Sequence, residues 1–168
     1  MDDAAILIDA FGRVHEEVHA AIEGMSADDL TVRLDADANS IAWLVWHLTR
    51  IQDDHVAHVA QHEQVWLTDG WMERFALPFE PLATGYGHTS EEVAAVRADA
   101  QLLLDYYDAV HDRTIAYLRT LEPNEMERIV DERWDPPVTL AVRLVSVLSD
   151  DLQHAGQAAY VRGVIERR

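Results

Sequence analysis

The N-terminal part of the chain carries an apolar stripe with the spacing of a helix. From Asp3 to about Met25, apolar side chains recur every three to four residues, which places them on one helical face. These side chains are Leu7, Phe11, Val14, Val18 and Ile22. The polar stretch 24–40 then interrupts the pattern, so the first predicted helix ends near Met25.

A second helical stripe follows Asn39 and Ser40, either of which can cap a helix. It begins near Ile41 and contains neither Gly nor Pro up to about Gln64. One face of this helix carries Ile41, Leu44, Leu48, Ile51, His55, Val59 and His62. The two histidines of this face are therefore predicted to point toward the protein interior.

Two further helices are predicted after a long connection. Residues 68–89 are rich in Gly, Pro and aromatic residues, and a loop of this length often has a function. The capping residue Thr89 starts a third helical pattern, which continues to about Leu121. Residues 134–137, Trp-Asp-Pro-Pro, cannot continue a helix, and a fourth apolar stripe begins at Thr139.

The four stripes predict an all-α fold, an antiparallel four-helix bundle formed by a single domain over residues 1–168. Composition agrees, because 168 residues with 49% hydrophobic content can bury one core. The sequence shows no strand pattern and no fixed repeat. Periodicity leaves the topology open between an up-down-up-down arrangement and one with a crossover in the long second connection.

Charge and cysteine content narrow the range of partners. The chain has 31 acidic and 13 basic residues, and its net charge of -18 disfavours binding to nucleic acid and to anionic membranes. It has no cysteine, which excludes disulfides, iron–sulfur clusters, thiolate zinc sites and a cysteine nucleophile. The N-terminus does not resemble a signal peptide, and no stretch approaches a membrane span. We therefore expect a cytoplasmic protein.

Polar residues interrupt the fourth stripe and suggest a metal site. Asp150 precedes His154 by four positions, so a carboxylate and an imidazole share one helical face. Buried charges are costly unless they are paired or bind a metal, and His47 of the second helix is a natural third group. Three such ligands would leave an open position on zinc or nickel for water or a substrate thiol. The alternative is a hydrogen-bonded Asp–His pair inside the bundle.

Two other histidine groups have simpler interpretations. His15-Glu16-Glu17-Val18-His19 matches the zinc-protease motif H-E-x-x-H, but its histidines flank the apolar stripe, and we interpret the match as accidental. A cluster formed by His55, His58 and His62 can in principle bind a metal. We favour two core histidines bonded to acids of the first or third helix, with a solvated His58.

Aromatic side chains are a further candidate for binding. They can wall an organic-ligand pocket at one end of the bundle, or they can serve as ordinary core and loop anchors. The residues concerned are Trp43, Trp46, Trp66, Trp71, Tyr86 and Trp134.

Two short stretches resemble the DinB superfamily. They are residues 40–48, Ser-Ile-Ala-Trp-Leu-Val-Trp-His-Leu, and the pattern Asp150-x-x-x-His154-Ala-Gly-Gln, and the similarity spans essentially the whole chain. That superfamily includes mycothiol-dependent maleylpyruvate isomerases and related thiol S-transferases, which are four-helix bundles with a metal. The resemblance implies that His47, Asp150 and His154 are the metal ligands. Asp150 stands where the family usually has His or Glu, which leaves Asp151 as an alternative carboxylate.

The resemblance also implies a function. A divalent metal, zinc or nickel, would lower the pKa of a thiol such as mycothiol, and the thiolate would attack an electrophilic small-molecule substrate. No residue stands out as a general base. Two alternatives remain: a non-catalytic metal- or ligand-binding, stress-related bundle protein, and a bundle in which the Asp150–His154 pair is purely structural. A homodimer is compatible with the long helices, since symmetric dimers are the commonest soluble assemblies.

Overall fold

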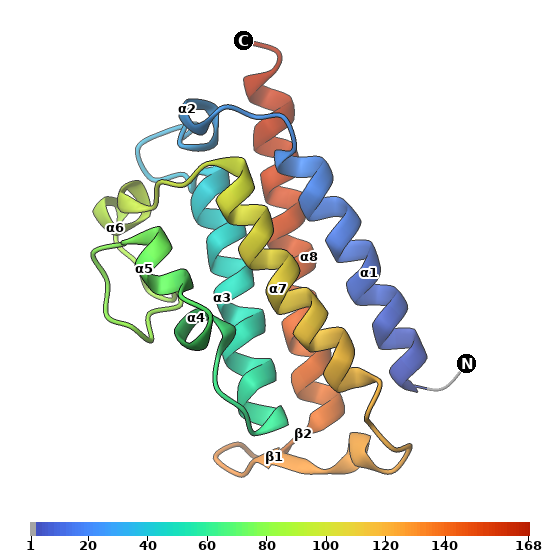
Figure 1. The fold of residues 1–168 in the computed structure, drawn as a ribbon. Coiled ribbons are helices and arrows are strands. Elements are labelled where there is room, and N and C mark those ends of the chain that lie inside the picture. Colours follow the sequence, from blue (N-terminus) through green and yellow to red (C-terminus); the bar gives the residue numbers. More distant parts are fainter. Residues whose placement is uncertain (1–2) are drawn as a thin grey trace.

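Four long helices dominate the computed structural model, which describes residues 3–168 (Figure 1). They are α1 (Asp3–Ile22), α3 (Ile41–Ala60), α7 (Ala100–Leu118) and α8 (Leu140–Ile165). α1 and α3 each pack against both α7 and α8. The prediction of a mostly helical chain is confirmed. In the described part of the chain, no helix combines the length and the apolar character that crossing a membrane requires.

Short elements fill the connections. α2 (Ala27–Leu30) follows α1, and three short helices lie between α3 and α7: α4 (Val65–Thr68), α5 (Trp71–Phe75) and α6 (Ser90–Ala95). The stretch before α8 holds a 3₁₀ turn, η1 (Glu125–Glu127), and an antiparallel pair of strands, β1 (Ile129–Asp131) and β2 (Val138–Thr139). The expectation of no strands is wrong for this hairpin, whose paired stretches are too short to show an alternating pattern.

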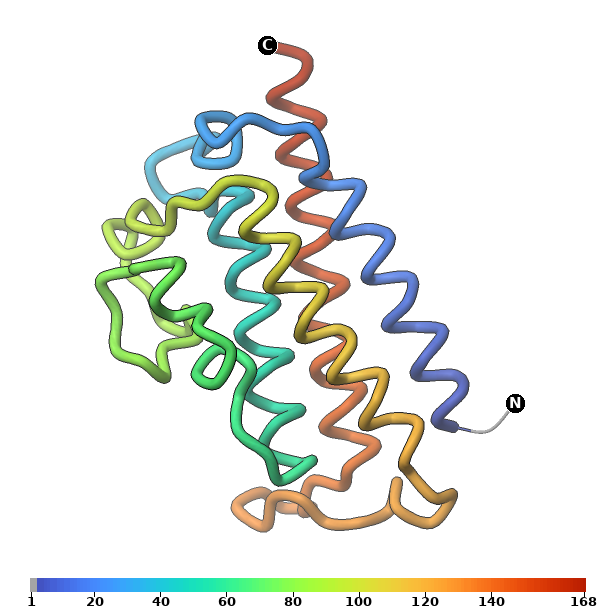
Figure 2. Tube along the Cα trace, in the orientation of Figure 1, coloured from blue at the N-terminus to red at the C-terminus, as the bar shows by residue number. Residues whose placement is uncertain are grey.

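The long second connection makes a crossover, one of the two topologies that periodicity left open. Figure 2 shows that α3 and α7 run in the same direction, whereas α1 and α8 run in the opposite one. The predicted antiparallel packing therefore holds for the contacts of α3 with α8 and of α1 with α7, but α1 with α8 and α3 with α7 run parallel, because the crossover reverses the expected direction of the second half of the chain. The chain between α3 and α7 returns along the outer side of α3 (Figure 1).

Side-chain caps set the helix starts. The Ser40 hydroxyl accepts a hydrogen bond from the Trp43 amide at 3.2 Å, so Ser40 rather than Asn39 caps α3. Thr139 caps α8 in the same way. α3 ends earlier than predicted, at Ala60, because Gln61 adopts a left-handed conformation with φ 57°.

The third predicted helix is divided in the structure. The capping box at Thr89 starts α6 as expected, but Val96 is extended and the chain leaves the helix there. Asp99 then accepts a hydrogen bond from the Leu102 amide at 2.8 Å and caps α7 as a new helix. A gap of four residues without Gly or Pro leaves no break in the apolar pattern, so the sequence predicted one helix instead of two.

The core forms where the four stripes meet. All five apolar side chains of the first stripe are buried, which confirms the helical spacing read from the sequence. On α3, every residue from Ile41 to Arg50 is buried, because α7 and α8 cover its inner side and the long connection covers its outer side. This burial places the polar side chain of His47 in the interior.

Candidate metal centre

The three side chains grouped from the sequence lie together between α3 and α8. His47 projects from α3, while Asp150 and His154 project from successive turns of α8. Each offers one ligand atom, and these three atoms all lie within 4.8 Å of one another. The four-residue spacing on α8 and the packing of α8 against α3 together produce this group.

The imidazole of His47 is fixed by the long connection. Its Nδ1 donates a hydrogen bond to the carbonyl oxygen of Thr84 at 2.5 Å, which leaves the lone pair on Nε2. The ring also stacks on Trp43, with 4.6 Å between ring centroids. A hydrogen bond at the second ring nitrogen is typical of metal-binding histidines, because it fixes both tautomer and orientation.

Gly85 makes this contact possible. Its φ of +94° lies in the region that favours glycine, and a Cβ at this position would come within 2.8 Å of His47 Nδ1. The same Cβ would also crowd the rings of Trp46 and Trp43. Only a glycine therefore allows the connection to approach the histidine this closely.

His154 is held in a similar way. Its Nδ1 donates to the side-chain oxygen of Gln157 at 2.8 Å, and its Nε2 lies 3.6 Å from Asp150 Oδ1. The rings of His154 and His47 are close, with centroids 4.8 Å apart. Both imidazoles are thus anchored through Nδ1, which leaves Nε2 as the ligand atom of each.

The electrostatics of the group favour a bound cation. Burial lowers the pKa of His47, so the ring is neutral and its lone pair is free. Burial also lowers the pKa of His154, but hydrogen bonds to Asp150 and Gln157 outweigh this effect and raise it overall. Oδ2 of Asp150 is buried and has no hydrogen-bond partner among residues 3–168. A carboxylate oxygen without a partner among the described residues lies beside the lone pair of His47 and beside Nε2 of His154, whose proton a metal would displace. This set of atoms fits a divalent metal.

Asp151, the alternative carboxylate, lies outside this group. Its side chain is fully buried, and neither of its oxygens has a hydrogen-bond partner in the described part of the chain. Burial, with a contribution from the charge of Asp150, raises the pKa of Asp151 well above its usual range. The geometry thus favours Asp150 as the carboxylate of the candidate centre.

Comparison with known proteins gives the family. The family model described as "MST: Mycothiol-S-transferase" matches residues 6–167. The chain belongs to the mycothiol S-transferase family. The resemblance to the DinB superfamily is thereby confirmed. No curated protein matches the chain.

A solved structure agrees with this family fold. The crystal structure of a conserved protein from Enterococcus faecalis is similar to this S-transferase family member over 100% of the chain and 99% of its own length. The two share 31% sequence identity and superpose with a TM-score of 0.93. The arrangement of the helices is therefore shared with a protein whose structure has been determined experimentally.

A cavity of about 490 Å³ opens beside the centre of this mycothiol S-transferase family member. Asp150 lines both the cavity and the histidine group. Arg143 also lines it, donating to Asp131 Oδ2 at 3.1 Å and contacting His55 Nδ1 at 2.8 Å. Arg133 completes the charged part of the wall. Sequence reasoning missed the two arginines, because their partners come from the hairpin and from α3.

The aromatic residues serve two different purposes. Trp43, Trp46, Trp66 and Trp71 are buried core side chains. Tyr86 and Trp134, in contrast, are 91% and 65% exposed and line the cavity beside Asp150. The aromatic pocket considered from the sequence is therefore limited to two residues.

The histidines at the end of α3 do not form a metal group among the described residues. His58 is exposed, as expected. His55 contacts Arg143 rather than an acid of α1 or α7, and His62 lies beyond the helix, bonded to the carbonyl oxygen of Glu63 at 2.8 Å. The predicted acidic partners are wrong, since α3 ends before His62 and the hairpin brings Asp131 to Arg143 instead.

Proposed function

We propose that this protein is a metal-dependent thiol S-transferase built on a DinB-like four-helix bundle. A divalent ion, zinc or nickel, would be held by His47, Asp150 and His154. The thiol would be mycothiol or a similar low-molecular-weight thiol, and the second substrate an electrophilic small molecule. Family membership supports thiol transfer. The observation that carries the metal is the buried Oδ2 of Asp150, which has no hydrogen-bond partner among residues 3–168 and lies beside two imidazoles anchored through Nδ1.

The chain's own residues prepare the site for this chemistry. A bound divalent ion would lower the pKa of a thiol and supply thiolate near neutral pH. His47 contributes a ring that burial keeps neutral, and Thr84 keeps that ring in one orientation. Asp150 contributes the negative charge that offsets a cation. The three residues act here as ligands and not as bases.

The adjoining cavity is the natural position for the substrates. Its charged wall, with Arg133 and Arg143, suits a polar thiol, while Trp134 and Tyr86 offer aromatic surface to an organic electrophile. Asp150 lies on the shared boundary, so a molecule in the cavity reaches the metal ligands directly. His55 lines the same space and can relay a proton from the thiol to solvent.

Metal analysis tests the proposal. Protein purified without chelator or affinity tag should bind zinc or nickel, and both His47→Ala and His154→Ala should bind one ion per chain fewer. His58→Ala is the matched control, because it removes an exposed histidine of α3 and should leave the metal content unchanged. Equal metal content in the wild type and both site variants would overturn the proposed centre.

A thiol-transfer assay separates the enzyme from a non-catalytic binding protein. Zinc- or nickel-loaded protein should accelerate the reaction of mycothiol with an electrophile such as monochlorobimane, and His154→Ala should abolish the acceleration. The alternative is a non-catalytic binding protein. Asp150 favours it, because the family usually has His or Glu at this position. Metal binding without thiol binding or turnover would support a metal- or ligand-binding bundle protein instead.

A further inference from the structure

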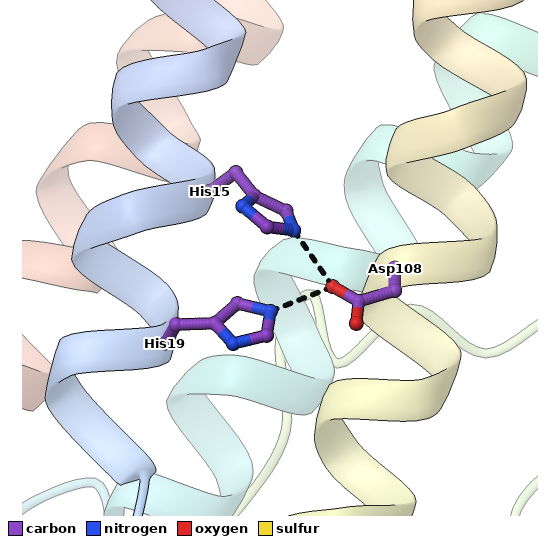
Figure 3. A group of neighbouring side chains, drawn as sticks. All are labelled: His15, His19 and Asp108. Atoms are coloured by element: carbon purple, nitrogen blue, oxygen red, sulfur yellow. Dashed lines mark hydrogen bonds and ion pairs between the residues drawn. The ribbon is translucent and has the colours of Figure 1, made fainter.

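A second group of metal-ligating side chains lies between α1 and α7. His15 and His19 come from successive turns of α1, and Asp108 comes from α7 (Figure 3). One ligand atom from each lies within 4.8 Å of the other two. None of the three belongs to the centre between α3 and α8, so the group is a separate feature of the fold.

The two imidazoles converge on a single carboxylate oxygen. His15 Nε2 lies 2.9 Å and His19 Nε2 lies 2.7 Å from Oδ1 of Asp108. Figure 3 shows both rings directed at this oxygen. Without a metal, each ring donates a proton to that oxygen. Zinc would take the place of both protons, because two Nε2 lone pairs and a carboxylate oxygen are the ligand atoms it prefers.

The distances require only a small adjustment for a metal. Tetrahedral zinc with bonds of about 2.0 to 2.2 Å separates its ligand atoms by about 3.3 Å. Each imidazole nitrogen would therefore move away from Asp108 Oδ1 by about half an ångström. They can do so, since the side chains of His15, His19 and Asp108 are 33%, 30% and 43% exposed and are not locked by the core.

A third histidine lies next to the group. The ring of His111, also on α7, has its centroid 4.6 Å from that of His15. Its Nδ1 is buried and has no hydrogen-bond partner among residues 3–168. His111 thus brings a further imidazole nitrogen close to the group. Asp112 adds a second carboxylate to the surroundings.

We propose that His15, His19 and Asp108 form a second, partly exposed zinc site that joins α1 to α7. The H-E-x-x-H spacing thus has a meaning other than a protease motif: it places two imidazoles on one helical face. Glu16, the base of such a protease, is exposed and lies outside the group. The site is independent of the proposed transferase activity, and the net charge of -18 favours the binding of a cation.

A zinc titration of His47→Ala tests the second site alone, because this variant lacks a ligand of the first centre. Zinc-free His47→Ala should bind one zinc per chain, and cobalt, the spectroscopic substitute, should give the visible absorption of a tetrahedral ion. Adding His19→Ala to this background should abolish both signals. Loss of a direct ligand should weaken binding by more than the roughly 10- to 100-fold that loss of an outer partner costs.

Two further variants exclude a folding defect as the explanation. Asp108→Asn keeps the shape of the side chain but removes its charge, so it should weaken zinc binding at least about tenfold while the helical circular dichroism stays unchanged. His58→Ala should have no effect. If His47→Ala binds no zinc, or if its zinc survives both His19→Ala and Asp108→Asn, the second site is overturned.

The same titration distinguishes failure of this proposal from failure of the first. Wild-type protein should bind two zinc ions per chain. A single zinc lost in His19→Ala but retained in His47→Ala would support the second site and contradict the centre between α3 and α8. A single zinc lost in His47→Ala but retained in His19→Ala would mean the reverse.

Discussion

At the scale of single residues, the backbone at Gly85 is a sensitive point of the candidate centre. Gly85→Ala should displace His47, because the added Cβ would lie 2.8 Å from His47 Nδ1 at a φ that already disfavours alanine. We expect loss of the metal held by His47 and a fall in the free energy of unfolding of more than about 1 kcal/mol. Metal content and urea denaturation measure the two effects.

Gly87 offers a matched control for that substitution. It also has a positive φ, +76°, but nothing lies within 4 Å of a Cβ built there. Gly87→Ala should therefore lose stability through backbone strain alone and keep its metal. If both variants kept their metal equally well, the close approach of Gly85 would have no bearing on the site.

A buried carboxylate elsewhere on α3 should affect stability more strongly. Asp53 accepts hydrogen bonds from the Val65 and Trp66 amides and from the Tyr106 hydroxyl, and it pairs with the fully buried Arg50 at 3.5 Å. Asp53→Ala leaves Arg50 as a buried charge without its acidic partner, which costs about 3 to 5 kcal/mol.

Urea denaturation tests this expectation, with Asp54→Ala as the control. Asp54 is only half-buried and bonds to the side chain of Gln64, so its loss should cost less than about 1.5 kcal/mol. Comparable losses of unfolding free energy in the two variants would show that the Arg50–Asp53 pair stabilises the protein no more than the half-buried Asp54 does.

At the scale of the elements, local signals determined how well the sequence predicted the structure. The starts of α3 and α8 were predicted because Ser40 and Thr139 are strong caps beside clear apolar stripes. The end of α3 and the break before α7 were not. Gln61 ends α3 in a left-handed conformation that its residue type disfavours, and the extended Val96 before α7 is an apolar residue that also fits a continuing helical stripe. Such ends are decided by tertiary packing.

The hairpin before α8 gives a pH-dependent prediction. Hydrogen bonds from Arg133, reinforced by the charge of Arg143, hold the pKa of Asp131 well below its usual range. A carboxylate with a lowered folded-state pKa stabilises the protein above its unfolded pKa and loses that contribution as the pH falls. Asp131→Asn should therefore unfold at a lower temperature than the wild type at pH 7.

Thermal unfolding across a pH series measures this difference. The gap between Asp131→Asn and the wild type should stay constant from pH 7 to about 5 and narrow below about pH 4. Glu132→Gln changes the exposed neighbouring position and should have the same unfolding temperature as the wild type at each pH of the series. A gap that widened on acidification would contradict the ion pair.

At the scale of the whole molecule, the sequence predicted the ligands of the candidate centre but not their surroundings. Asp150 and His154 stood out because polar residues at helical spacing interrupted the apolar face of the fourth stripe, and His47 was added as a third group from the second helix and by the DinB resemblance. Thr84 and Gly85 could not be found in this way, since only the crossover brings them against α3. Asp108 was missed for the same reason: it lies 93 residues from His15 and meets it only through packing.

Metal removal should lower the stability of the whole chain, because both proposed sites join helices distant in sequence. A ligand present at about 100 times its Kd stabilises the folded state by about 2.7 kcal/mol, or about 5 to 10 °C in Tm for a chain of this size. Scanning calorimetry of the zinc-free and zinc-loaded protein measures the shift. The double variant His47→Ala/His19→Ala should show none.

The attachment of the long connection to α3 has a consequence for motion. Two successive carbonyl oxygens of this connection, those of Ala83 and Thr84, accept hydrogen bonds from Arg50 and His47. Any ion that fixes the His47 ring must also slow the local opening of this segment, since coupling between two sites is reciprocal. The backbone amide of His88 donates a hydrogen bond to the Gly85 carbonyl. Hydrogen exchange of this amide should therefore slow when a metal binds at His47. Conversely, a partner that pulled the connection away from α3 would release the ion.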